Sequence, residues 1–70
     1  MVIQLTLVSD IYDFIEVSQK HKSDVRLFQG TYVVDGKSIL GVFTLDLRKP
    51  ITCVVEDNVY TDFERFASKK

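Results

Sequence analysis

The first residues of the chain alternate between apolar and polar side chains. In the stretch "VIQLTLV" (residues 2–8), Ile3, Leu5 and Leu7 fall on one side and the polar residues between them fall on the other. A period of two is the pattern of a half-buried strand. Residues 2–8 are therefore predicted to form a strand whose apolar side faces the core.

The spacing of apolar residues then changes to that of a helix. Ser9 and Asp10 carry side-chain oxygens suited to an N-cap, and apolar residues recur at helical spacing at Ile11, Phe14 and Ile15. This pattern predicts a helix that runs to about residue 22. Its last turn is basic and solvated, which suits the negative pole of the helix dipole, and comprises Lys20, His21 and Lys22.

The middle of the chain predicts a hairpin and a short helix. In "DVRLFQGTYVVDG" (residues 24–36), apolar and polar positions alternate on both sides of Gly30, which supplies the turn. In "GKSILGVFTL" (residues 36–45), Ser38 is a good N-cap for about two helical turns, although Gly41 costs roughly 1 kcal/mol relative to alanine. The residues of this helix expected in the core are Val42 and Leu45.

A strand and a short helix end the chain. The strand "ITCVVE" (residues 51–56) follows Pro50, and Cys53 is expected to face inward as a small apolar residue. Asn58 is expected to cap the final helix. The apolar positions of each element share one side: Ile51, Cys53 and Val55 on the strand, and Val59, Phe63, Phe66 and Ala67 on the helix.

The predicted elements follow the order β-α-β-β-α-β-α within a single domain of residues 1–70. This order favours an α+β fold, a two-layer open-faced sandwich in which a four-stranded antiparallel sheet carries the helices on one face. Seventy residues are near the lower limit for folding without disulfides or metals. The uncovered face of the sheet is expected to be mostly polar, with Gln4, Thr6, Arg26, Phe28, Thr52 and Val54.

Composition narrows the class of function. Nine basic and ten acidic residues give a net charge of −1, which lacks the basic excess that nucleic acid binding requires. Cys53 is the only cysteine, so no disulfide or thiolate metal cluster forms within the chain. The N-terminal stretch lacks the features of a signal peptide, and no apolar run reaches the ~18 residues of a membrane span. We expect a cytoplasmic protein without membrane association, metal or cofactor.

The stretch around Ser38, with a strand pair before it and a strand after it, resembles a known family. It is similar to the region around the regulatory serine of HPr, the phosphocarrier of the sugar phosphotransferase system, which is commonly Lys-Ser-Ile-Met-Gly-Val-Met. The stretch "SQKHKSDVRLFQG" (residues 18–30) fits the end of that family's first helix and its second strand without a gap. The resemblance covers essentially the whole chain in element order and implies an HPr-like fold.

The chain departs from that family where the chemistry occurs. HPr carries a phosphate on a histidine in a Gly-Leu-His-x-Arg-Pro loop at the start of its first helix, whereas here the strand runs directly into "VSDIYDF" (residues 8–14). Asp10 and Asp13 lie there instead, where they would repel a phosphoryl group and are expected to stabilise the helix start. His21, the only histidine, is at the other end of the helix. No histidine phosphotransfer and no other catalysis is expected.

The resemblance implies a protein-binding role for the segment of Lys37, Ser38, Ile39, Leu40 and Phe43. In HPr and its histidine-less, Crh-like branch, the equivalent serine is phosphorylated, which adds about 1.5 to 2 negative charges at a helix N-terminus. The equivalents of Ile39, Leu40 and Phe43 form an exposed apolar patch that docks proteins. The alternative for Phe43 is an inward orientation that fills the core.

These observations predict a non-catalytic HPr-like protein that acts by contact with protein partners. The resemblance suggests an HPr kinase and a carbon-control transcriptional regulator as partners, with phosphorylation of Ser38 as the switch. The alternative is a structural module with no role in the phosphotransferase system. In that case its sheet edges and apolar patch would drive self-association into a homodimer.

Overall fold

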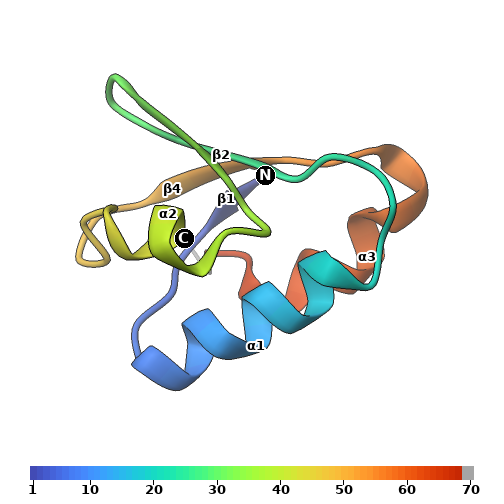
Figure 1. The fold of residues 1–70 in the computed structure, drawn as a ribbon, viewed down its shortest axis with the longest axis horizontal. Helices are drawn as coiled ribbons and strands as arrows, with labels where there is room; N and C mark the ends of the chain where they lie inside the picture. The colour runs from blue at the N-terminus through green and yellow to red at the C-terminus, as the bar shows by residue number, and fades with distance from the viewer. Residues whose placement is uncertain (69–70) are drawn as a thin grey trace.

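A computed structural model describes residues 1–68 and shows helices packed against one face of an antiparallel sheet (Figure 1). The strands are β1 (Val2–Ile3), β2 (Arg26–Gln29), β3 (Tyr32–Asp35) and β4 (Ile51–Val54). The helices are α1 (Val8–Gln19), α2 (Ile39–Phe43) and α3 (Tyr60–Phe63), and 3₁₀ turns flank α3 at Asp57–Val59 and Glu64–Phe66. The predicted α+β class and element order are confirmed.

The strands lie in the order β1-β4-β2-β3, and each neighbouring pair is antiparallel. The side chains that point from the sheet toward the helices are buried, as the alternation predicts; they include Ile3, Leu27, Ile51 and Cys53. Aromatic rings fill the space between α1 and the C-terminal helical segment. The ring of Phe14 lies 5.5 Å from that of Phe63 and 5.2 Å from that of Phe66, centroid to centroid.

The start of the chain differs from the prediction, because β1 is shorter and α1 begins earlier. Leu7 is the N-cap residue of α1 and is exposed, so its predicted inward position is wrong. The cause is Asp10, whose Oδ2 accepts hydrogen bonds from the backbone N–H groups of Thr6 (3.0 Å) and Leu7 (2.9 Å). These bonds turn the chain out of the strand before Ser9, which lies inside the helix instead of capping it.

The end of α1 also differs from the prediction. The helix ends at Gln19 and not near residue 22. The N–H groups of Lys20 and His21 bond to carbonyl groups three residues earlier, at 3.2 and 3.3 Å. These tighter bonds end the α-helical ladder.

The β2–β3 hairpin is confirmed, with a two-residue loop of Gly30 and Thr31. Gly30 has a φ of +58° and is the only residue with positive φ among residues 1–68, which is the pattern of a type II′ turn. Gly36 follows β3 at a close approach to Val25. Its N–H donates to the Val25 carbonyl oxygen at 2.7 Å, and a Cβ at this position would lie 2.4 Å from Val25 Cγ1.

A glutamine side chain joins this hairpin to the loop that follows α2. Gln29 Oε1 accepts a hydrogen bond from the Asp46 N–H (2.7 Å), and Gln29 Nε2 donates to the Asp46 carbonyl oxygen (2.8 Å). Asp46 in turn pairs with Arg48, whose Nε lies 3.1 Å from Asp46 Oδ1. Hydrogen bonds from Arg48 lower the pKa of the Asp46 carboxyl group.

The uncovered face of the sheet carries Arg26, Phe28, Thr52 and Val54, as predicted. Val2 and Val33 are also exposed there, so the face is more apolar than the mostly polar surface that was predicted. The register places Val2 beside Thr52, Thr52 beside Phe28, and Phe28 beside Val33. Gln4 and Thr6, which were expected on this face, lie beyond the end of β1.

The C-terminal segment confirms the predicted burial and corrects the predicted cap. Val59, Phe63 and Phe66 are buried. Asn58 lies within the first 3₁₀ turn and does not cap it, because the turn starts with the Val59 N–H bonded to the Glu56 carbonyl oxygen (3.1 Å). The segment is divided into three brief helical turns, of which only the middle one is α-helical.

Candidate protein-binding face

The start of α2 places the candidate residues on the surface. Ser38 is the N-cap, and its Oγ accepts a hydrogen bond from the Gly41 N–H at 3.2 Å. Such a cap contributes about 1 kcal/mol to helix stability. The predicted capping role of Ser38 is therefore confirmed, and its side chain is half-buried at the helix start.

The side chains of α2 divide between the core and the solvent. Val42 and Leu45 are buried as predicted, whereas Leu40 is 78% exposed and Phe43 is 43% exposed. Phe43 therefore does not fold inward to fill the core. Ile39 is partly buried and packs against the core beside them.

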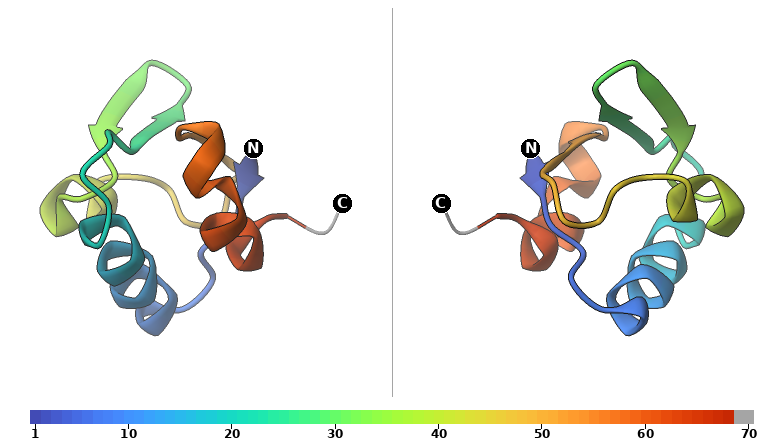
Figure 2. Two further views of the ribbon diagram at one scale, coloured as in Figure 1. Left: turned by 90° about the vertical axis from the view of Figure 1, so that its right-hand side faces the viewer. Right: turned by 90° about the vertical axis from the view of Figure 1, so that its left-hand side faces the viewer.

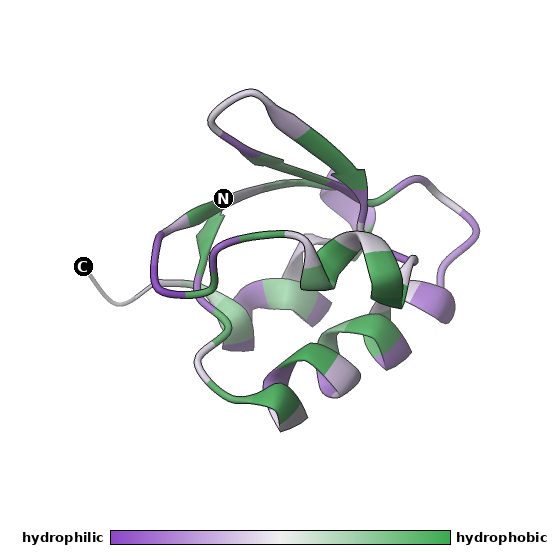
Figure 3. Ribbon diagram, turned by 60° about the vertical axis from the view of Figure 1, so that its left-hand side comes forward, coloured by the Kyte–Doolittle hydropathy of each residue, from purple (hydrophilic) through white to green (hydrophobic). Residues whose placement is uncertain are grey.

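Two residues of α1 extend the apolar surface of α2, and the sequence analysis did not identify them. Tyr12 is 55% exposed, and its ring meets that of Phe43 edge to face, with centroids 6.4 Å apart and an interplanar angle of 73°. Val8 is one turn before Tyr12 and is also exposed. Figure 3 shows the apolar segments of α1 and α2 lying next to each other. We call this surface the α1–α2 face, and it consists of Val8, Tyr12, Ile39, Leu40 and Phe43.

Lys37 has a different position from the rest of the predicted segment. Its Nζ donates a hydrogen bond to the His21 carbonyl oxygen at 2.6 Å, and its own carbonyl oxygen accepts one from Gln19 Nε2 at 3.3 Å. The ammonium group thus lies at the C-terminal end of α1, where carbonyl groups lack helical partners. Lys37 therefore joins α2 to α1 and is not a free cation beside Ser38.

His21 is not the solvated residue that was predicted. Its side chain is 19% exposed, and its Nε2 lies 3.0 Å from Asp62 Oδ2. The His21 ring also packs beside that of Phe63, with centroids 5.9 Å apart. These contacts tie the end of α1 to α3, far from the start of α1 where a phosphoryl-carrying histidine would stand in HPr.

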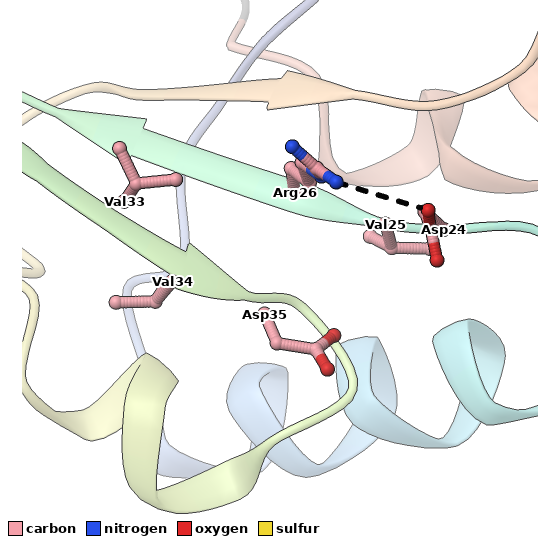
Figure 4. Close-up of a pocket in the computed structure, with 6 residues that line it drawn as sticks. All are labelled: Asp24, Val25, Arg26, Val33, Val34 and Asp35. Atoms are coloured by element: carbon pink, nitrogen blue, oxygen red, sulfur yellow. Dashed lines mark ion pairs between the residues drawn. The ribbon is translucent and has the colours of Figure 1, made fainter.

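A depression on the hairpin carries charged side chains from both of its strands. It is lined by residues at the start of β2 and along β3, and Figure 4 shows Arg26 paired with Asp24 at its rim, with Nη2 and Oδ2 3.9 Å apart. Asp35, on the other strand, accepts a hydrogen bond from the Lys37 N–H at 2.9 Å. Among residues 1–68, no three histidine, cysteine or acidic side chains are grouped so that they could hold a metal ion.

Cys53 is buried in the core, as predicted for a small apolar residue. Burial raises the pKa of its thiol from the ordinary value of 9.0 to about 11. The thiol is therefore neutral near pH 7 and is not an activated nucleophile.

No family model, curated protein or solved structure matches this chain. Within the part of the chain that is described, none of the helices is both long and apolar enough to cross a membrane.

Proposed function

We propose that this chain is a non-catalytic, HPr-like module that binds protein partners through the α1–α2 face. The observation that carries the proposal is the exposure of Leu40 on α2, together with that of Phe43, whose ring meets the exposed ring of Tyr12 on α1. A contiguous apolar patch on a small domain usually marks an interaction site. The element order and the open-faced sandwich support the HPr-like assignment.

The arrangement of the α1–α2 face suits binding for two reasons. Burial of an exposed leucine side chain contributes about 1.5 to 3 kcal/mol, so a partner that covers Leu40 gains binding energy of this order there. The edge-to-face contact of Tyr12 and Phe43 holds both rings before binding, which lowers the entropy lost on association. Glu16, one turn after Tyr12, is exposed, and its Oε1 lies 3.8 Å from Lys20 Nζ. A partner with an apolar centre and a rim of polar groups fits this face.

Phosphorylation of Ser38 is the switch in this proposal. The Ser38 oxygen already accepts the Gly41 N–H, and a phosphate there would add about 1.5 to 2 negative charges directly before Ile39 and Leu40. The charge would change the affinity of the α1–α2 face for a partner. An HPr kinase and a carbon-control transcriptional regulator are the proposed partners, as the resemblance around Ser38 suggests.

The first experiment measures the intact mass of the protein after incubation with ATP and an HPr kinase. One added phosphate is expected on the wild type and none on Ser38→Ala. Ser38→Thr is the matched control, because threonine keeps both the cap and an acceptor hydroxyl group. A folded wild-type protein that stays unmodified would remove the switch.

The second experiment measures binding of a carbon-control regulator, by calorimetry, to the phosphorylated and unmodified protein. Leu40→Asp is expected to weaken binding at least about tenfold, because it places a charge in the centre of the interface. Val54→Asp is the control, since Val54 is similarly apolar and 51% exposed but lies on the sheet, away from α2. Equal affinity of the two variants, or no binding by the wild type in either state, would contradict the proposed partner and face.

A further inference from the structure

The two edges of the sheet differ in whether another segment of the chain pairs with them. The outer edge of β1 is covered by the C-terminal segment, because the Ser68 N–H donates to the Val2 carbonyl oxygen (2.8 Å) and the Gln4 N–H donates to that of Phe66 (2.9 Å). Strand β3 pairs with β2 alone, and no other strand of residues 1–68 lies beside it. Figure 2 shows the β2–β3 hairpin extending away from the helices. The sheet therefore has one closed edge and one open edge.

The backbone of Val33 is directed out of the open edge. The Gly36 N–H donates to the Val25 carbonyl oxygen, which makes these two residues a hydrogen-bonded pair of the β2–β3 ladder. Bonded and non-bonded pairs alternate along an antiparallel ladder. The pair of Val33 with Phe28, three positions along, is consequently non-bonded. The N–H and C=O groups of Val33 thus point away from β2 and are oriented to pair with another strand.

The side chains of this edge do not protect it. Natural proteins shield open edges with lysine, proline or a bulge, and none of these occurs in the stretch "TYVVD" (residues 31–35). Its residues are mostly β-branched or aromatic, and Val33 is 58% exposed. The only charged side chain is Asp35 at the end of the strand, and its Oδ1 already accepts the Lys37 N–H.

We propose that β3 pairs with β3 of a second copy of this chain, antiparallel and with the two-fold axis at Val33. In this register the outward N–H and C=O groups of Val33 bond to the same groups in the second copy. Opposed residues stand on the same side of the joined sheet, as an antiparallel pair requires. Thr31 stands opposite Asp35 of the second copy, so that a hydroxyl group faces a carboxylate and no like charges are opposed.

The uncovered face favours a second copy over an unrelated extended segment. Within one chain, the register forms a row from Val2 through Thr52 and Phe28 to Val33. The two-fold axis at Val33 joins this row to its symmetry mate, so that the two valines and two phenylalanines form one continuous apolar strip. An unrelated strand would satisfy the backbone of β3 but would not supply this strip. The pairing is separate from the α1–α2 face and goes beyond the function proposed above.

The test is sedimentation equilibrium of the purified chain at concentrations up to about 1 mM, which detects dissociation constants in the millimolar range and below. A monomer–dimer equilibrium is expected, with a dimer of twice the 8.1 kDa chain mass. Val33→Lys opposes two lysines at the axis and is expected to weaken the dimer at least about tenfold. Val54→Lys is the matched control, because Val54 is on the same face and is 51% exposed, but lies on β4.

A second variant tests the backbone directly. Val33→Pro removes an N–H that points out of the sheet, so it leaves the β2–β3 ladder intact and is expected to abolish the dimer while the circular dichroism spectrum is retained. A monomer at every concentration would overturn the proposal. Equal weakening by Val33→Lys and Val54→Lys would also overturn it. So would a dimer that resists both Val33 variants and is dissociated by Leu40→Asp, because association would then use the α1–α2 face.

Discussion

Substitution of Gly36 by alanine tests the close approach that ends the β2–β3 hairpin. A Cβ at this position would lie 2.4 Å from Val25 Cγ1, 3.1 Å from Val25 Cβ and 3.2 Å from the Val25 carbonyl oxygen. Optimal carbon–carbon contacts are about 3.5 to 4.0 Å, so one side chain or backbone segment must move by about 1 Å. Val25 is buried in the core, and the Gly36 N–H is bonded to its carbonyl oxygen at 2.7 Å. Neither Val25 nor the backbone at residue 36 can move away without losing core contacts or this hydrogen bond.

Gly36→Ala lowers the free energy of unfolding in two ways. Overpacking of a core position costs about 1 to 3 kcal/mol, and weakening the bond between Gly36 and Val25 adds about 0.5 to 1.5 kcal/mol. We expect Gly36→Ala to lower the free energy of unfolding by about 2 to 4 kcal/mol. A domain of this length is stable by roughly 4 to 10 kcal/mol, so the variant should fold with a clearly lower urea midpoint.

The assay is urea unfolding followed by circular dichroism, since the chain contains no tryptophan. Gly41→Ala is the matched control, because its Cβ would meet Ser38 Oγ and Val34 Cβ at 3.4 Å, an ordinary contact. The control is expected to gain up to about 1 kcal/mol of helix propensity. Val25→Ala combined with Gly36→Ala should be less destabilised than the sum of the single variants, since removal of Cγ1 relieves the clash.

A Gly36→Ala variant within about 0.5 kcal/mol of the wild type, at an unchanged denaturant dependence, would show that the backbone does not approach Val25 this closely. Additive single and double variants would show that the cost arises elsewhere. Either result would also weaken the assignment of the outward direction of Val33, which depends on the same hydrogen bond.

Three further predictions concern the core and the loop after α2. Phe14→Ala removes the ring that meets those of Phe63 and Phe66 and should cost about 3 to 5 kcal/mol, measured as a lower thermal midpoint; a loss below about 1 kcal/mol would contradict the packing. Gln29→Glu replaces the donor to the Asp46 carbonyl oxygen at 2.8 Å with an acceptor and should cost about 1 to 3 kcal/mol in urea unfolding, whereas unchanged stability would show that the side chain does not hold the loop. Burial raises the pKa of the Cys53 thiol from 9.0 to about 11, so between these pH values the unfolded state loses the thiol proton while the folded state keeps it. The contribution of the buried neutral thiol to the free energy of unfolding is complete below pH 9.0 and is lost as the pH rises toward about 11. Urea unfolding across this range should show a steeper decline for the wild type than for Cys53→Ala, and parallel declines would be evidence against the shift.

Local patterns in the sequence predicted the parts of the fold that local chemistry determines. The alternation around Leu27 and Cys53, the turn at Gly30 and the cap at Ser38 each depend on a few neighbouring residues. The start of α1 was misjudged because several adjacent polar residues offer capping oxygens. The choice of Asp10 depends on its reach back to the N–H groups of residues 6 and 7.

Long-range contacts explain the remaining differences. The contact between His21 Nε2 and Asp62 Oδ2 joins residues 41 positions apart, and no periodicity indicates it. Tyr12 belongs to the α1–α2 face only because α2 lies across α1, although its spacing from Val8 was a usable signal of an apolar stripe outside the core. The apolar character of the uncovered face depends in the same way on the register that places Val33 beside Phe28.

The closed edge of the sheet has a consequence for synthesis on the ribosome. Strand β1 is made before its partners, which are β4 and residues 66–68. Until those residues emerge, β1 has no strand to join and Phe14 lacks the rings of Phe63 and Phe66. The hairpin and α2 form from contacts near in sequence and can fold earlier. Until residues 51–68 have left the ribosome, a nascent chain therefore exposes the apolar side chains of β1 and α1, to which a holding chaperone can bind.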